Sequence, residues 1–240
     1  LHQPMFLLLA NLSVLETLYT SLIVPKLLAD LLAQTGTISF SGCLTQLFFF
    51  LSLASSECFL LSTMACDRYL AICYPLHYPA IMDLRFCLHL ALGAWMSGFL
   101  ASFVSIVLIS HLRFCGPNVL NHFFCDLSPL LQLSCSDITS IEVLDFLAAL
   151  AVLLTSLLVT MVSYAHILNT VLRIPGRAGR QKAFSTCASH LVVVTIFYST
   201  TIFMYARPHA VNSFDLNKFV SVVYTTVTPL LNPIVYRMKT

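Results

Sequence analysis

Two acidic side chains lie inside long apolar segments, where ionisable groups are costly and usually serve a function. Glu16 lies near the middle of residues 5–30, and Glu57 near the middle of residues 43–70. Two carboxyl groups at similar membrane depth could share a proton or hold a small cation. The alternative is that each is protonated and hydrogen-bonds to a neighbouring helix. We favour a shared site at Glu16 and Glu57.

Two further motifs combine charge or proline with an apolar segment. Asp67-Arg68-Tyr69 ends the segment that holds Glu57, and Arg68 follows Glu57 by eleven residues, close to three helical turns, so the two share a helix face. An ordinary interfacial ion pair would explain Asp67 and Arg68 equally well. Asn232-Pro233 lies deep in the last apolar segment, where proline kinks a helix and predicts either a hinge or a static bend.

The nine cysteines fall into two groups. Cys115, Cys125 and Cys135 lie in a polar segment at about 111–138, and Cys43 stands at the outer start of residues 43–70. An oxidising compartment favours disulfides among these four, although spacing alone leaves three pairings open, and free thiols are the alternative. We interpret the remaining five as small apolar fillers rather than metal ligands: Cys58, Cys66, Cys73, Cys87 and Cys187.

The elements that position these residues are membrane-spanning. The chain is 58% hydrophobic and 9% charged, whereas a soluble domain is roughly one quarter charged. This composition excludes a disordered chain, a collagen and a coiled coil, and the net charge of +2 does not suggest a nucleic-acid partner. Continuous apolar runs favour helices over a β-barrel. Six spans are predicted, at about 5–30, 43–70, 87–110, 140–170, 183–206 and 217–236.

The basic residues predict the orientation of these spans. Eight Lys and Arg side chains fall on one side and four on the other, which places both ends of a six-span chain in the cytoplasm. The chain begins with Leu1-His2-Gln3-Pro4, without an initiator Met or a basic signal-peptide region. We therefore expect it to be a piece of a longer protein.

Five motifs, in order along the chain, resemble those of the olfactory receptors, which are rhodopsin-like (class A) G-protein-coupled receptors. They are Leu1-His2-Gln3-Pro4-Met5-Phe6, Met64-Ala65-Cys66-Asp67-Arg68-Tyr69-Leu70-Ala71-Ile72-Cys73, Ser163-Tyr164, Lys182-Ala183-Phe184-Ser185-Thr186-Cys187-Ala188-Ser189-His190-Leu191 and Pro229-Leu230-Leu231-Asn232-Pro233-Ile234-Val235-Tyr236. Two residues depart from the family pattern: Cys66 stands where Tyr is usual, and Ser199 where Gly is usual.

The resemblance implies an all-α membrane protein, a seven-helix bundle of which helices 2–7 are present, so that residues 1–240 form a single receptor domain lacking helix 1. In that topology the native amino terminus lies outside the cell. It also implies pairing of Cys43 with Cys125 and of Cys115 with Cys135, and an allosteric sodium ion at Glu16 and Glu57, with no other cofactor. The expected location is the plasma membrane of olfactory cilia.

The resemblance also implies that a small, volatile odorant binds in the outer half of the bundle. Helical spacing places five candidate residues on one face of the second span, and helices 5 to 7 add the rest. The candidates are Phe50, Leu51, Ala54, Ser55, Cys58, Ala148, Val152, Tyr198, Thr201, Ile202, Tyr205, Val222 and Thr225. Their mixture predicts an uncharged ligand, and a charged amine is disfavoured because this face of the second span lacks an acid.

Activation, as the resemblance implies it, moves helix 6 and opens an inner cleft for the olfactory-type stimulatory G protein, which raises cAMP. The residues assigned to coupling are Asp67, Arg68, Tyr69, Tyr164, Lys182, Asn232, Pro233 and Tyr236. A non-olfactory rhodopsin-like receptor and a six-span channel or transporter are the alternatives. An enzyme is not expected, because no His or Cys constellation accompanies the buried acids.

Overall fold

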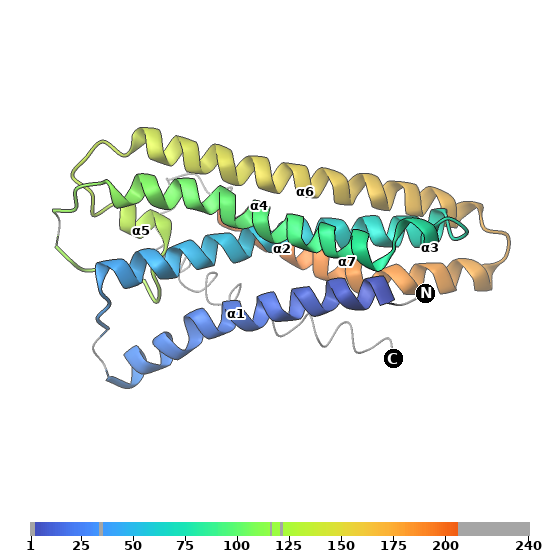
Figure 1. Ribbon diagram of the computed structural model, residues 1–240, viewed down its shortest axis with the longest axis horizontal. Helices are drawn as coiled ribbons and strands as arrows, with labels where there is room; N and C mark the ends of the chain where they lie inside the picture. The colour runs from blue at the N-terminus through green and yellow to red at the C-terminus, as the bar shows by residue number, and fades with distance from the viewer. Residues whose placement is uncertain (1–2, 34–35, 116, 121, 206–240) are drawn as a thin grey trace. The chain divides into compact units, whose positions relative to one another are not determined.

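The computed structural model describes residues 3–33, 36–115, 117–120 and 122–205. Five long helices occupy these residues (Figure 1): α1 (Gln3–Ala33), α2 (Phe40–Cys73), α4 (Leu84–Ser110), α6 (Thr139–Arg173) and α7 (Arg177–Tyr205). They cover the first five predicted spans and begin up to six residues earlier. The sixth predicted span, 217–236, lies outside the described residues.

The long helices are apolar enough to cross a membrane. Four of them, α1, α2, α4 and α6, meet this requirement by length and composition. The helix α7 adds a fifth when Arg177–Ser185 and His190–Ile202, which are bent by 48° relative to each other, are taken as one span. The fold is therefore that of an α-helical, multi-span membrane protein.

Two short helices, which the sequence analysis did not predict, lie in the connecting segments. They are α3 (Tyr78–Ile81) and α5 (Leu127–Leu131). Asp126 caps α5 by accepting a hydrogen bond from the Leu127 N–H at 2.8 Å. Pro129 lies in the first turn of α5, where a missing N–H has no helical partner to lose. The predicted loop at about 111–138 is therefore partly helical.

The described chain divides into two compact units. One contains residues 15–59 and 92–154, and we call it the disulfide unit because both disulfides lie in it. The other contains residues 3–14, 60–91 and 155–205 of the described chain, and we call it the arginine unit after Arg68. Each unit has its own buried side chains and is described separately.

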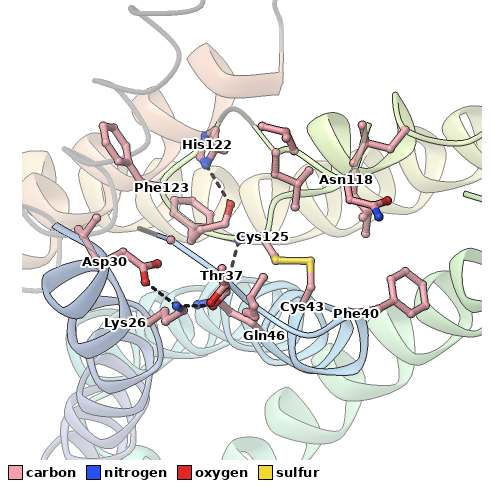
Figure 2. Close-up of a pocket in the computed structure, with 18 of the residues that line it drawn as sticks. Lys26, Asp30, Thr37, Phe40, Cys43, Gln46, Asn118, His122, Phe123 and Cys125 are labelled. Carbon is pink, nitrogen blue, oxygen red and sulfur yellow. Dashed lines mark hydrogen bonds and ion pairs between the residues drawn. A yellow bond between two sulfur atoms is a disulfide. The ribbon is translucent and has the colours of Figure 1, made fainter. Parts of the chain in front are cut away.

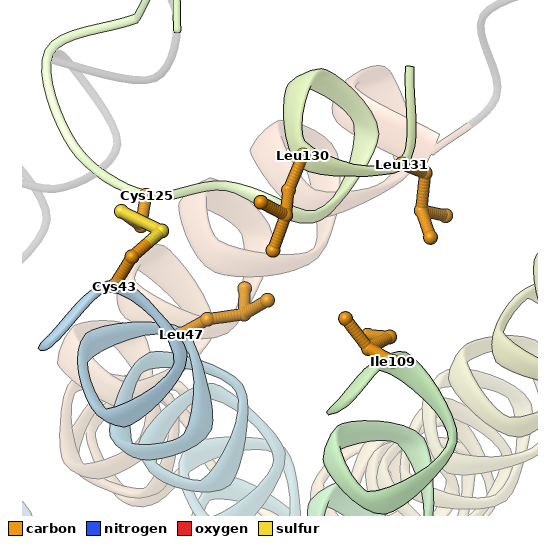
Figure 3. Close-up of a cluster of buried hydrophobic side chains, with 6 residues drawn as sticks. All are labelled: Cys43, Leu47, Ile109, Cys125, Leu130 and Leu131. Atoms are coloured by element: carbon orange, nitrogen blue, oxygen red, sulfur yellow. A yellow bond between two sulfur atoms is a disulfide. The ribbon is translucent and has the colours of Figure 1, made fainter. Parts of the chain in front are cut away.

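The disulfide unit has a buried cluster where α5 meets the ends of α2 and α4. Figure 3 shows Leu130 and Leu131 of α5 facing Leu47 of α2 and Ile109 of α4, with the Cys43–Cys125 disulfide at one edge. Figure 1 shows α5 beside those two helix ends. Cys135 donates its backbone N–H to the Arg113 carbonyl at 2.9 Å, which joins the segment after α5 to the segment that follows α4.

Close contact between α2 and α4 depends on a glycine in the disulfide unit. A Cβ added at Gly98 would lie only 2.6 Å from the Ser52 carbonyl oxygen. The Ser56 hydroxyl donates to the Trp95 carbonyl at 3.4 Å across the same contact. Small residues let membrane helices approach closely, and Gly98 serves that purpose here.

The arginine unit is built around two buried clusters. Tyr78 and Met82 of the segment after α2 contact Cys87 of α4, and Ile167 and Val171 of α6 contact Cys187 of α7. Gly176, with φ +99°, lies between α6 and α7. Glycine adopts this left-handed conformation without steric cost, and it commonly ends a helix in this way.

Candidate functional sites

Asp67 and Arg68 form a buried ion pair at the inner end of α2. Their side chains lie 2.5 Å apart, from Arg68 Nη2 to Asp67 Oδ2, and Arg68 Nε approaches the same oxygen at 3.0 Å. Asp67 is 0% exposed and Arg68 9% exposed. Breaking a buried pair leaves an uncompensated charge, so this pair differs from the surface ion pair that the sequence left open.

Tyr78 completes this group, and sequence reasoning missed it. Its hydroxyl donates a 2.7 Å hydrogen bond to Asp67 Oδ1, the oxygen that Arg68 does not contact. Burial, followed by the hydrogen bond to Asp67, raises the pKa of the Tyr78 hydroxyl. Pro79 was a local signal for the start of a short helix, but it gave no indication that Tyr78 would reach Asp67.

A second polar contact in the arginine unit joins α6 and α7. The Tyr164 hydroxyl lies 2.5 Å from His190 Nδ1, and the two rings stack at 5.8 Å between centroids. Both residues belong to motifs singled out in the sequence, although His190 had no assigned role. Tyr69 instead packs its ring on Tyr74 and His166.

Cys66 faces α6 in the same unit. Its sulfur lies 3.8 Å from the Ser163 hydroxyl, and Cys73 Sγ lies 3.2 Å from the Thr170 hydroxyl. These contacts place Cys66 in the α2–α6 packing. The Lys182 side chain, together with Asn232, Pro233 and Tyr236, lies outside the described part of the chain.

The predicted acidic pair lies within the disulfide unit. Glu16 of α1 and Glu57 of α2 are each 6% exposed, and their carboxyl groups interact electrostatically. Within the described residues, no three His, Cys, Asp or Glu side chains gather as a metal site. Glu16 and Glu57 by themselves supply carboxylate oxygens, and oxygen is the ligand type that hard cations prefer.

The structure contains both disulfides that the resemblance implies. Cys43 and Cys125 join the start of α2 to the loop, with 5.4 Å between their Cα atoms, and Cys115 and Cys135 close the loop on itself at 5.9 Å. Gln46, a residue that sequence analysis did not identify, reinforces the first disulfide. Its Oε1 accepts from the Cys125 N–H at 3.0 Å, and its Nε2 donates to the Leu22 carbonyl at 3.2 Å.

A cavity of about 830 Å³ opens beside this disulfide. Figure 2 shows Lys26 between Asp30 and Thr37: Lys26 Nζ donates to Asp30 Oδ1 at 2.5 Å and to the Thr37 carbonyl at 2.7 Å. Aromatic side chains provide much of the remaining wall, namely Phe40, Phe114, Phe123 and Phe124. Among the predicted odorant-binding residues that the structure describes, none lines this outer cavity.

The predicted odorant-binding residues occupy different environments. In the disulfide unit, Phe50 is buried and packs its ring at 5.3 Å from Tyr19 and at 5.2 Å from Phe124, measured between centroids. Cys58 is buried, whereas the remaining members of this unit are partly buried or line its core: Leu51, Ala54, Ser55, Ala148 and Val152.

The other predicted members lie on α7 or beyond it. In the arginine unit, Tyr198 and Thr201 are buried and Ile202 is 41% exposed. The Tyr205 side chain, Val222 and Thr225 lie outside the described residues.

Comparison with known proteins identifies the family. The family model described as "Olfactory receptor" matches residues 1–240. Human Olfactory receptor 6B1 is 56% identical over 239 residues, covering 100% of this chain and 76% of the relative. Human Olfactory receptor 6A2 and rat Olfactory receptor 226 are each 54% identical over 243 residues, covering 100% of this chain and 74% of each relative.

The apolar helices define a multi-pass α-helical membrane protein, and the comparisons place it among the class A G-protein-coupled receptors. The chain belongs to the olfactory receptor family. Its members are receptors and not enzymes.

Proposed function

We propose that this chain binds a small, volatile, hydrophobic odorant among its membrane-spanning helices and activates a stimulatory heterotrimeric G protein, which raises cAMP. The observation that carries this proposal is the match to the olfactory receptor family over all 240 residues. The proposed location is the plasma membrane of olfactory cilia, with residues 1–240 acting as a single receptor domain.

The odorant site proposed from the sequence contains apolar walls with a few polar groups. This is the usual composition of a small-molecule pocket, where polar groups fix the orientation of the ligand. Ser55, Tyr198 and Thr201 supply hydroxyl groups. Tyr205 and Thr225 add two further hydroxyl groups. The remaining members supply apolar or sulfur-containing surface: Phe50, Leu51, Ala54, Cys58, Ala148, Val152, Ile202 and Val222.

Coupling in this proposal depends on release of Arg68. In the arginine unit, Arg68 forms an ion pair with Asp67, and Tyr78 donates a hydrogen bond to Asp67. We interpret this arrangement as the resting state. A ligand drives activation only by binding the active state more tightly than the resting state. Breaking the Asp67–Arg68 pair would present the guanidinium group to a G protein, with Tyr69, Tyr164, Lys182, Asn232, Pro233 and Tyr236 rearranging around it.

The acidic pair is proposed as an allosteric sodium site. Glu16 and Glu57 are buried in the same unit, and a monovalent cation would offset the repulsion between two ionised carboxylates. Sodium would supply positive charge there and no reactive chemistry. The alternative is one shared proton.

The test is replacement of Arg68 by Ala in cells that contain the stimulatory G protein. The chain is expressed both as these 240 residues and with the first transmembrane helix of a relative fused to its amino terminus. An odorant panel is screened by cAMP, with surface staining in parallel. Arg68→Ala is expected to reduce the odorant-evoked cAMP at least tenfold at equal surface expression.

Arg173→Ala is the matched control, because Arg173 is an exposed arginine in the last turn of α6. It should preserve the cAMP response. An odorant-evoked ion current without cAMP would contradict G-protein coupling and favour the channel alternative. An unchanged cAMP response in Arg68→Ala would remove Arg68 from the mechanism.

A further inference from the structure

A buried carboxyl group near the start of α6 has no role in the function proposed above. Asp145 follows the first residue of α6, Thr139, by six positions, or about 9 Å along the helix axis. It is 8% exposed, whereas Glu142, less than one turn earlier on the same helix, is exposed. An acid that could reach water from this end of the helix is instead enclosed by protein.

Only one of the two carboxyl oxygens of Asp145 is satisfied within the described residues. The Ser105 hydroxyl of α4 hydrogen-bonds to the carboxyl group. The other oxygen, Oδ2, is buried and has no hydrogen-bond partner among the residues that the structure describes. Neither of the ion pairs formed by the described residues includes Asp145.

This arrangement is unfavourable unless something else supplies a donor. Leaving a buried charged acceptor unsatisfied costs more than leaving a neutral one, and each such group in a native structure calls for an explanation. Ser102, a buried serine less than one turn before Ser105 on α4, does not supply this donor, because its hydroxyl donates to the Gly98 carbonyl at 3.0 Å. The lone pairs on Asp145 Oδ2 are therefore available to a molecule that carries its own hydrogen-bond donor.

The position of Asp145 relates it to the proposed odorant site. Asp145, Ala148 and Val152 are spaced i, i+3 and i+7, so they share one face of α6. Ala148 and Val152 are half-buried and were proposed to contact the odorant. Asp145 extends that face outward by about one turn and adds an acidic group, which the predicted odorant-binding face of the second span lacks.

We propose that Asp145 is a specificity-determining residue that selects odorants with an O–H or N–H donor, namely alcohols and primary amines. Asp145 Oδ2 accepts the hydrogen bond while Ser105 holds the carboxyl group in place. Carboxylic acids are disfavoured, because two carboxylates repel each other in a site with little water. This inference rests on the proposed odorant-binding function and refines it, since amines are no longer excluded.

The test measures binding without a G protein. The purified chain in lipid nanodiscs is titrated with four probes of similar length: octan-1-ol, octylamine, heptyl methyl ether and octanoic acid. The rise in thermal unfolding midpoint gives the apparent affinity, with probe concentrations corrected against empty nanodiscs. The wild-type chain should bind octan-1-ol and octylamine at least tenfold more tightly than the ether or the acid.

Three variants separate selection from folding. Asp145→Leu should weaken both donor probes about tenfold, while the affinity for the ether changes less than twofold. Asp145→Asn should keep its affinity for octan-1-ol, because the amide retains an acceptor. Its affinity for octylamine should fall, and its affinity for octanoic acid should rise. Glu142→Gln, an exposed acid on the same helix, should leave all four affinities unchanged.

Several outcomes would overturn the inference. They are a wild-type chain that does not prefer donor probes, an equal loss of ether and donor binding in Asp145→Leu, and identical selectivity in Asp145→Asn. An equal loss would assign Asp145 to helix packing. Because this assay contains no G protein, failure of cAMP signalling with donor selectivity intact would count against the coupling proposal alone.

Discussion

At the residue scale, the arrangement that matters is a chain of three side chains in the arginine unit. Arg68 contacts one oxygen of Asp67 and Tyr78 contacts the other, so both oxygens are occupied. The sequence singled out Asp67 and Arg68 by their spacing at the end of a span. It did not single out Tyr78, because a partner supplied by a connecting segment has no periodic signal.

Tyr78→Phe tests whether this hydrogen bond restrains the Asp67–Arg68 pair. Phenylalanine keeps the buried ring but removes the donor, which leaves Asp67 Oδ1 unsatisfied and weakens the resting arrangement. Basal cAMP per surface receptor is expected to rise about threefold. A change of this size requires a free-energy shift between resting and active states that is smaller than the contribution of one hydrogen bond to a charged group.

Tyr74→Phe is the matched control for that experiment. Tyr74 is 48% exposed and contacts the Tyr69 ring rather than the Asp67 carboxylate, so its substitution should leave basal cAMP unchanged. A basal signal in Tyr78→Phe that equals the wild-type value would show that Tyr78 contributes packing only.

At the element scale, a small residue sets the distance between helices in the disulfide unit, and a capping residue sets where a short helix begins. Gly98 brings α4 against the backbone of α2. Asp126 starts α5 inside the loop that the sequence predicted to be non-spanning. A helix of five residues is too short to be stable alone, so its formation depends on Leu130 and Leu131 entering the buried cluster.

Gly98→Ala should destabilise the α2–α4 contact. The added methyl group would collide with the Ser52 carbonyl, a backbone atom that cannot rotate away, and overpacking of this kind costs about 1–3 kcal/mol. The thermal unfolding midpoint in nanodiscs should fall by several degrees. Gly93→Ala on the same helix meets nothing within 4 Å and should be neutral or slightly stabilising. Equal midpoints for the two variants would contradict the close approach at Gly98.

Asp126 predicts a pH dependence of stability. Burial raises the pKa of its carboxyl group, against the opposing effects of His122 and the Leu127 N–H. The folded state thus holds this proton to higher pH than the unfolded state does, and its contribution to stability is lost as pH rises from the unfolded pKa through the folded pKa. Asp126→Asn removes this half-buried charge and keeps a capping side chain.

At neutral pH, Asp126→Asn is expected to unfold at a higher temperature than the wild type. The difference between the two unfolding midpoints should become smaller as the pH falls toward about 4. Asp137→Asn is the opposing control. Hydrogen bonds from Thr139 lower the pKa of Asp137, so its stabilising effect is present above its unfolded pKa and is lost on acidification. A difference in unfolding midpoint between Asp126→Asn and wild type that widens in acid would refute the assignment of a raised pKa to Asp126.

At the scale of the whole molecule, composition and charge-free segment length were sufficient to predict the helical membrane class, and the motif order was sufficient to predict the family. The long helices that the structure describes were predictable because crossing a bilayer requires about 20 apolar residues in succession. The short helices α3 and α5, the bridging amide of Gln46 and the buried Asp145 were not predictable. Each depends on contacts between segments distant in sequence, which span periodicity does not encode.

The covalent anchoring of the loop also determines which motions at the outer cavity are fast and which are slow. The loop beside the outer cavity is fixed to α2 by the Cys43–Cys125 disulfide and by Gln46, and to itself by Cys115–Cys135. Side chains such as Phe123, which is 39% exposed, can rotate in picoseconds to nanoseconds, whereas uncatalysed disulfide rearrangement takes minutes to hours. A molecule that entered this cavity in less than minutes would therefore do so with both disulfides intact, while side chains such as Phe123 rotate around it.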